Sequence, residues 1–298
     1  MRRSMRRRAF VAVDAPAAKS AQLRTNGEQR ADSSAAVGIH AGAAILSAAV
    51  LVDSALEHYR GGFFRSAMYV APMTAGLACG AATLGVRNAP GQHPTRDAVY
   101  VLAAIVGATG TWFHLMNVSR RGGGPWTNVF YGAPAAAPLG LHVAGLLGLC
   151  ADQLQRGDAP RGLQRRLASS SVVILSAVGL LGTSAEAWLF HFRGAFQNPF
   201  MYAPVVLPPI AAGALCVATV TRDTAWARAA DLLLRATATL GVVGVGFHAY
   251  GVQRRMGGWR NWTQNLFSGP PVPAPLAFTA LALAGLAALR VARTRGEF

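Results

Sequence analysis

The chain has 298 residues, of which 52% are hydrophobic and 13% are charged, and its mean hydropathy is +0.32. Soluble domains carry roughly 25% charged residues, so this composition excludes an ordinary soluble globular domain and favours an integral membrane protein. The formal net charge is +16, but the arginines fall in an N-terminal segment and in short loops instead of on one basic face. We therefore expect no nucleic-acid binding, and we expect contacts with anionic lipid headgroups or an anionic ligand.

The three cysteines, Cys79, Cys150 and Cys216, lie inside or at the end of apolar runs, and the sequence contains no Cys-x-x-Cys pair. This spacing argues against structural zinc, iron–sulfur clusters and covalently attached haem. We interpret the three as small apolar residues of helices.

The N-terminal segment begins with a cluster of arginines and continues with Ser, Ala and Gln, and it is too polar to cross a bilayer. We predict a disordered basic arm over residues 1–34. A first four-helix repeat over 35–160, a second over 161–292 and a C-terminal tail over 293–298 are expected to follow.

Eight apolar stretches can each reach the roughly 20 residues needed to cross the hydrocarbon core, and they predict an all-α integral membrane protein with eight transmembrane helices. The expected spans are 37–57, 67–87, 97–117, 129–150, 169–190, 201–221, 232–252 and 267–291. Seven or nine spans would require one stretch to lie flat or to break, and prolines near the start of several even-numbered stretches are candidate breakers. Most Lys and Arg residues lie on the side of the N-terminal arm. We therefore predict a bacterial-type inner membrane protein with both termini in the cytoplasm.

An internal repeat organises these stretches. The segment His-Tyr-Arg-Gly-Gly-Phe at 58–63 returns as His-Phe-Arg-Gly-Ala-Phe at 191–196, and we call these the A loops. Phe-His followed by Arg-Arg and Gly-Gly at 113–124 returns at 247–258, and we call these the B loops. The order A-B-A-B predicts four parallel helical hairpins built by duplication of a four-helix unit and related by rotation about the membrane normal.

The repeated histidines are the candidate cofactor ligands: His58, His114, His191 and His248. Two imidazoles on facing helices can hold a b-type haem, and in a fourfold ring His58 would face His191 while His114 would face His248. Ligand type would also allow copper or iron, and the spacing selects no metal. The alternative is a structural role, in which each ring bridges the apolar and aqueous layers and bonds to loop carbonyls.

Arginines and asparagines near these histidines form a candidate ligand site. Its residues are Arg60, Arg120, Arg121, Arg193, Arg254, Arg255, Asn128 and Asn265. Guanidinium groups fit a carboxylate, a phosphate or a quinone carbonyl, and the neighbouring glycines let the backbone approach a ligand. Binding of lipid phosphate is the alternative for the arginines.

Two acidic residues complete the pattern. Asp53 and Glu186 each stand five residues before an A-loop histidine, and a carboxylate inside the membrane is costly enough to be a functional candidate. We predict that they belong to a proton path or pair with a loop arginine. His142, in the middle of a span, is expected to form a hydrogen bond between helices.

These features predict a membrane electron-transfer subunit that handles b-type haem or quinone at its outer face, as part of a membrane oxidoreductase and without an assigned catalytic residue of its own. Its expected partners are the lipid bilayer and a periplasmic redox protein or another membrane subunit. The alternatives are a channel or transporter for an anionic or metal-ion substrate, and a scaffold that docks a periplasmic partner.

Overall fold

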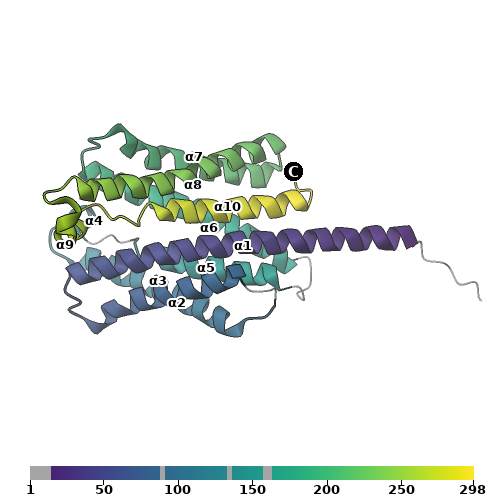
Figure 1. Cartoon of the computed structure of the whole chain (residues 1–298), viewed down its shortest axis with the longest axis horizontal. Helices are drawn as coiled ribbons and strands as arrows, with labels where there is room; N and C mark the ends of the chain where they lie inside the picture. Colours follow the sequence, from purple (N-terminus) through teal and green to yellow (C-terminus); the bar gives the residue numbers. More distant parts are fainter. Residues whose placement is uncertain (1–14, 88–90, 133–135, 157–162) are drawn as a thin grey trace, which may run out of the picture.

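The computed structural model shows an all-helical membrane protein (Figure 1). It describes residues 15–87, 91–132, 136–156 and 163–298, with the side chains of 15–29 and 163–167 left aside, and these ranges contain no strand. Seven of the helices are long and apolar enough to cross a membrane by length and composition. The chain is therefore a multi-pass membrane protein.

Each half of the chain contributes four long helices. The first half contains α1 (Ala15–Arg60), η1 (Ser66–Tyr69), α2 (Val70–Arg87), α3 (Pro94–Arg120), α4 (Pro125–Tyr131) and α5 (Leu139–Gln155). The second half contains α6 (Leu163–Arg193), η2 (Pro199–Tyr202), α7 (Ala203–Thr221), α8 (Thr224–Gln253), η3 (Gly258–Asn261), α9 (Trp262–Ser268) and α10 (Leu276–Thr294). Within the first half α1 packs on α2, α2 on α3, α3 on α5 and α5 on α1, and the second half repeats these neighbours with α6, α7, α8 and α10.

The two halves meet where α1 packs on α10 and where α5 packs on α6. The inner helices are therefore α1, α5, α6 and α10, while α2, α3, α7 and α8 lie outside them. The hairpins with A loops, α1–α2 and α6–α7, have their first helix inside. The hairpins with B loops, α3–α5 and α8–α10, have their second helix inside. The expected ring of four equivalent hairpins is wrong for this reason, because the arrangement repeats only twice.

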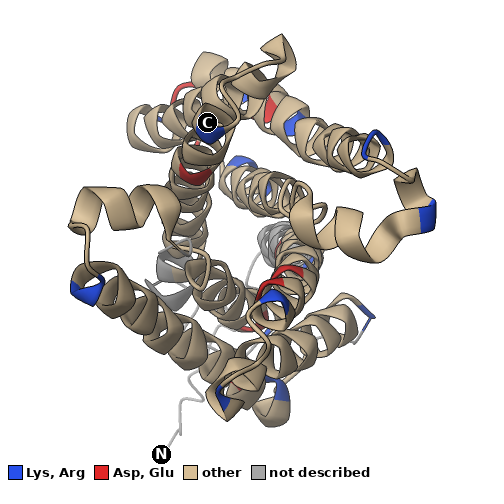
Figure 2. Cartoon of the chain, turned by 90° about the vertical axis from the view of Figure 1, so that its left-hand side faces the viewer, with Lys and Arg blue, Asp and Glu red and all other residues tan. Residues whose placement is uncertain are grey.

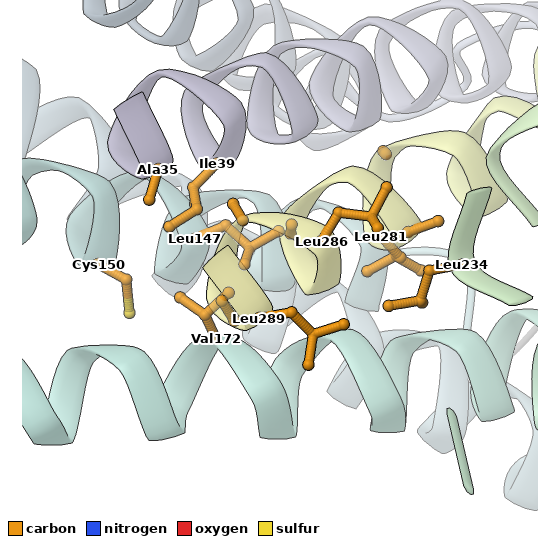
Figure 3. Close-up of a cluster of buried hydrophobic side chains, with 14 of the residues drawn as sticks. Ala35, Ile39, Leu147, Cys150, Val172, Leu234, Leu281, Leu286 and Leu289 are labelled. Carbon is orange, nitrogen blue, oxygen red and sulfur yellow. The ribbon is translucent and has the colours of Figure 1, made fainter. Parts of the chain in front are cut away.

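Small side chains allow the inner helices to pack closely. Most of the buried core residues of α10 are alanine or leucine, and 72% of its most apolar stretch is buried. Leu281, Leu286 and Leu289 of α10 lie among Leu147 of α5 and Val172 of α6 in the central cluster (Figure 3). Because lipid is as apolar as these side chains, it is close van der Waals contact that favours this packing.

The expected spans 129–150 and 267–291 are each divided. α4 ends at Tyr131 and α5 begins at Leu139, whereas α9 ends at Ser268 and α10 begins at Leu276. Both breaks contain prolines, and a proline lacks the N–H that would continue the helix. α5 is left with 17 residues, and it is not among the seven candidate spans. Pro134 lies outside the described residues.

The N-terminal arm also differs from its expected extent. α1 begins at Ala15, so residues 15–34 are helical instead of disordered. This segment is rich in alanine and other good helix formers, and its proline lies in the first turn, where it is tolerated. The helix projects beyond the rest of the bundle (Figure 1), and residues 1–14 lie outside the described part of the chain.

The A loops, α4 and α9 lie at one end of the bundle, which we call the histidine end. The C-terminus and the projecting part of α1 lie at the other end, which we call the terminal end (Figure 1). Figure 2 shows the chain from the histidine end, with basic residues in loops and at helix ends and with most of the helical ribbon uncharged. The helices therefore direct the repeated loops to a common surface.

Candidate functional site at the histidine end

The two A-loop histidines have the same hydrogen bond. His58 Nδ1 donates to the backbone oxygen of Met68 at 2.6 Å, and His191 Nδ1 donates to that of Met201 at 2.8 Å. A carbonyl oxygen only accepts, so Nδ1 carries the hydrogen in both rings. Each histidine thereby ties the end of one long helix to the start of the next.

The backbone of the A loops repeats as well. Phe63 and Phe196 both adopt left-handed conformations, with φ of 45° and 44°. Their rings stack on Tyr69 and Tyr202 with centroid distances of 4.1 and 4.4 Å. A non-glycine residue in this region is uncommon and is held by its surroundings. The same ring stack supports this conformation in both loops.

His248 in the second B loop makes a related contact. Its Nδ1 donates to the backbone oxygen of Pro271 at 2.6 Å, in the segment that separates α9 from α10. His248 and His191 lie close enough for their charges to interact. His114 occupies the corresponding place on α3. The structure thus brings His191 and His248 of the second half together.

The B-loop asparagines hold their own loops. Asn128 Nδ2 donates to the backbone oxygens of Val118 and Arg121 at 2.9 and 2.7 Å. Asn265 Nδ2 makes the same pair of bonds to two carbonyls of its loop, at 3.1 and 2.8 Å. Both side chains are buried. Their amide nitrogens are therefore committed to loop structure, whereas the sequence pattern predicted that these residues bind a ligand.

A cavity of about 750 Å³ opens between the loops of the second half. Three of the predicted ligand-binding arginines line it, namely Arg193, Arg254 and Arg255, together with Phe190 and Ser268. Its volume lies within the range of pockets that bind small molecules. Arg255 Nη1 donates to Ser268 Oγ at 2.9 Å. Arg120 and Arg121, the corresponding residues of the first half, are exposed at the end of α3.

Arg193 is fixed in this cavity by groups without charge. Its Nη2 donates to the backbone oxygen of Val129 at 2.9 Å, and its guanidinium carbon lies 5.1 Å from the centre of the Phe190 ring and 5.9 Å from that of Phe130. Its Nε is buried without a hydrogen-bond partner among the described residues. The contacts of Arg193 position its charge without neutralising it.

The carboxyl groups of Asp53 and Glu186 lie near each other. They come from α1 and α6, the corresponding helices of the two halves, and their charges are close enough to interact. Within the described ranges neither group has a hydrogen bond or ion pair, and both side chains are partly buried. Phe190 and Arg193 follow Glu186 by four and seven residues and therefore share its face of α6. That face leads from the carboxyl pair to the cavity.

The structure also shows a buried group of polar side chains near the terminal end that the sequence analysis missed. It includes His40, Arg96 and Asp152, which are 0%, 6% and 1% exposed. Arg96 and Asp152 stand just outside the expected spans 97–117 and 129–150, and the sequence gives no sign that they meet. His142, by contrast, bonds through Nδ1 to the backbone oxygen of Ala104 at 2.7 Å, which confirms the predicted hydrogen bond between helices.

The described residues contain no group of three or more His, Cys, Asp or Glu side chains placed to hold a metal ion. Comparison with protein-family models, with curated protein sequences and with solved structures gave no match.

Proposed function

We propose that the chain is a membrane transporter that binds an anionic substrate in the arginine-lined cavity and couples its movement to protons through Asp53 and Glu186. The observation that carries this proposal is the un-neutralised charge of Arg193 in a cavity that also contains Arg254 and Arg255. Guanidinium groups bind carboxylate and phosphate oxygens through paired hydrogen bonds. A small organic acid or a phosphate is therefore the class of ligand that fits.

The difference between the two halves supports this role. Arg60 stands on α1 where Arg193 stands on α6, and its Nη1 pairs with Glu57 at 2.6 Å. The residue that corresponds to Glu57 on α6 is Phe190, whose ring can contact the guanidinium but cannot cancel its charge. The two A loops thus share the arginine but differ in the residue beside it, a carboxylate in the first half and an aromatic ring in the second. This difference favours an external anion as the partner of Arg193.

The carboxyl pair supports the coupling to protons. Two acidic groups close together in a medium of low polarity do not both ionise readily, so a pair of this kind takes up and releases a proton. Glu186 lies about 10 Å from Arg193 along α6, by the helical rise of 1.5 Å per residue. An anion bound at Arg193 and a proton bound at Glu186 would therefore both change the charge on α6. This shared helix is the proposed link between anion binding and proton uptake.

The membrane topology is part of the proposal. α5 follows α4 and a proline-containing break in the same way that α10 follows α9, and α10 is a candidate span. We assign α5 as the eighth span on this correspondence, which also supports duplication of a four-helix unit. An even number of spans leaves both termini on one side. The excess of arginines near the terminal end assigns that side to the cytoplasm of a bacterial-type inner membrane.

The proposal is tested with purified protein in proteoliposomes. Uptake of radiolabelled phosphate and of succinate is measured with and without an imposed pH gradient. The expected result is uptake of at least one of these anions that the gradient accelerates, and loss of that uptake in Arg193→Gln. Arg60→Gln is the matched control, because Arg60 is already neutralised by Glu57, and it should retain uptake. Equal uptake by protein-free liposomes, or equal loss in both variants, would refute the proposal.

The hydrogen bonds of the histidines favour a second candidate, electron transfer through b-type haem. A histidine that ligates a metal through Nε2 commonly donates Nδ1–H to a carbonyl oxygen, and His191 and His248 both do so while lying close together. In this second candidate, His191 and His248 are the proposed axial ligands, in place of the pair His58 and His191 expected from the sequence. Haem would supply one-electron chemistry. A reducible Soret band that is lost in His248→Ala would support this candidate, and a colourless preparation would eliminate it.

A further inference from the structure

The first half of the bundle contains a buried polar cluster that the proposed transport site does not use. We call it the first-half cluster, and it consists of five side chains from α1, α3 and α5. They are His40, Arg96, Tyr100, Asp152 and Gln155, with exposures of 0%, 6%, 0%, 1% and 3%. A buried group of this kind costs free energy unless it is paired and hydrogen-bonded.

Asp152 lies at the centre of the cluster. Arg96 Nε donates to Asp152 Oδ2 at 3.0 Å and Arg96 Nη2 donates to Asp152 Oδ1, so the pair is bidentate. Arg96 Nη2 also donates to Gln155 Oε1 at 3.0 Å. His40 Nε2 lies 3.4 Å from Asp152 Oδ1 without an aligned hydrogen bond. His40 Nδ1 lies 3.1 Å from the hydroxyl oxygen of Tyr100.

Two glycines make room for the rings. A Cβ atom at Gly85 would lie 2.5 Å from Nδ1 of His40, and one at Gly148 would lie 2.4 Å from the Tyr100 ring. The backbones of α2 and α5 therefore approach the rings more closely than any other residue would permit. The histidine and the tyrosine are held in place on two sides.

The second half has the same helices without this cluster. At the corresponding places of the sequence repeat stand Val173, Ala230, Leu234, Leu289 and Ala292, all apolar. Leu234 and Leu289 are 0% and 1% exposed, so they fill a core as tightly closed as that around Tyr100 and Asp152. The same four-helix arrangement therefore forms with apolar residues at these five positions.

The difference between the two halves indicates whether the first-half cluster is needed for stability. Replacing a buried ion pair by well-packed apolar residues is often neutral or stabilising, by about 1–4 kcal/mol. The second half shows which residues do so in this fold. Stability of the bundle consequently gives no reason for the first half to contain His40, Arg96 and Asp152.

An ion pair connects the cluster to the surface. Arg156 pairs with Asp97, and their side chains are 31% and 26% exposed. The carboxyl groups of Asp97 and Asp152 are close enough to interact directly. Asp97 Oδ1 is buried and has no hydrogen-bond partner in the described part of the chain. Asp97, Asp152 and His40 thus form a row of neighbouring titratable side chains, which leads from the partly exposed terminal end into the closed interior of the bundle.

We propose that the first-half cluster is a proton-binding site, in which a proton enters at the Asp97–Asp152 carboxyl pair and is held by His40. The transfer is a single proton step. The O–H bond of protonated Asp152 breaks and an N–H bond forms at His40 Nε2, 3.4 Å from Asp152 Oδ1. The imidazolium then faces the Asp152 carboxylate, and its Nδ1–H donates to the oxygen of Tyr100.

The surroundings of His40 contain the charges needed to stabilise the imidazolium. α3 presents Arg96 and Tyr100, and Asp97 acts through its contact with Asp152, which α5 presents. α2 approaches the ring with its backbone at Gly85. α10 faces α1 with alanine residues at this level, as the contacts of Gly38 and Gly42 with Ala280, Ala284 and Ala287 show. Asp152 is therefore the anion in direct contact with the ring.

The test is deuterium exchange at the C2–H of His40, followed by mass spectrometry of the full-length protein in detergent across about pH 5 to 8, where histidine titrates. Exchange at this carbon depends on the protonation of the ring. We expect the rate at His40 to follow a titration curve although the side chain is 0% exposed. A rate that does not vary with pH, or no exchange at any pH, would overturn the proposal.

Two matched variants test the route. Asp231 of α8 corresponds to Asp97 and pairs with Arg235 and with Arg293, the second of which corresponds to Arg156. The places that correspond to Asp152 and His40, however, hold Leu289 and Val173. Asp97→Asn removes an anion from the route and should move the midpoint at His40 to lower pH. Asp231→Asn should leave that midpoint unchanged. If both variants, or neither, moved the midpoint, Asp97 would not be the entry to the site. Anion uptake is a separate measurement, so its failure would not affect this result.

Discussion

The guanidinium carbon of Arg193 lies 5.1 Å from the centre of the ring of Phe190, three residues earlier on α6. At the corresponding places on α1, Arg60 forms an ion pair of 2.6 Å with Glu57. The two halves therefore place the same arginine beside groups of opposite character. The charge of Arg60 is neutralised by Glu57 on the same helix, whereas the charge of Arg193 faces the cavity without an acidic partner among the described residues.

Exchange of these neighbours should control anion binding. Phe190→Glu supplies α6 with the carboxylate that α1 already has, and it should weaken the affinity for the transported anion by about 10-fold or more, since a nearby intramolecular carboxylate competes for the guanidinium. Equilibrium binding of the radiolabelled anion measures the change. Phe190→Leu is the control for loss of the ring alone and should have a smaller effect. Equal loss in the two variants would show that the ring, and not the charge, matters.

The carboxyl pair should control coupling and leave binding intact. Asp53→Asn and Glu186→Gln remove the titrating groups without changing their size, so uptake should lose its dependence on the pH gradient. Affinity for the anion should change little, because neither group lines the cavity. Glu57→Gln, on the exposed side of α1, serves as the control. Gradient-driven uptake that survives in the double variant would contradict the assignment.

The A-loop histidines should contribute to stability. His58→Ala and His191→Ala each remove an Nδ1 donor and leave a backbone carbonyl in the loop without its partner. We expect each to lower the free energy of unfolding by about 1–3 kcal/mol, as for loss of a partly buried hydrogen bond. Thermal unfolding in detergent gives the comparison. Unchanged stability in both variants would show that the histidines do not hold their loops.

The first-half cluster should be dispensable for folding only if it is replaced as a whole. Arg96→Ala alone leaves Asp152 buried without its cation and should cost about 3–5 kcal/mol. The fivefold variant His40→Val, Arg96→Ala, Tyr100→Leu, Asp152→Leu and Gln155→Ala copies the second half and should recover most of that loss. Thermal unfolding of the two variants decides the matter. A fivefold variant less stable than Arg96→Ala would contradict a role outside stability.

The sequence contained enough information to predict the helices and the repeated loops. Apolar length indicated a helical membrane protein, and the spacing of His58 and His191 indicated equivalent loops, which the hydrogen bonds to Met68 and Met201 bear out. Hydropathy could not separate α9 from α10, because Leu266 and Phe267 before the break are as apolar as the helix after it. The proline-rich segment at 270–275 was the available indication of a break.

The pairing of the helices could not be predicted from the sequence. Equal loops suggested four equivalent hairpins, but which helix of each hairpin lies inside depends on contacts between segments far apart in the chain, such as that of α1 with α10. The contact of Arg193 with Val129 is of the same kind. Arg96 and Asp152 were overlooked because each is a single charge at a helix end, and only their meeting across 56 positions makes them a cluster.

Thermal unfolding in the presence of phosphate, succinate and citrate tests the central claim most directly, since a ligand that binds only the folded state stabilises it by about 2.7 kcal/mol at 100 times its dissociation constant. At least one of these anions should raise the unfolding temperature of the wild type and of Arg60→Gln, and it should have no effect on Arg193→Gln. An equal rise in all three proteins, or a rise in none, would contradict an anion site at Arg193.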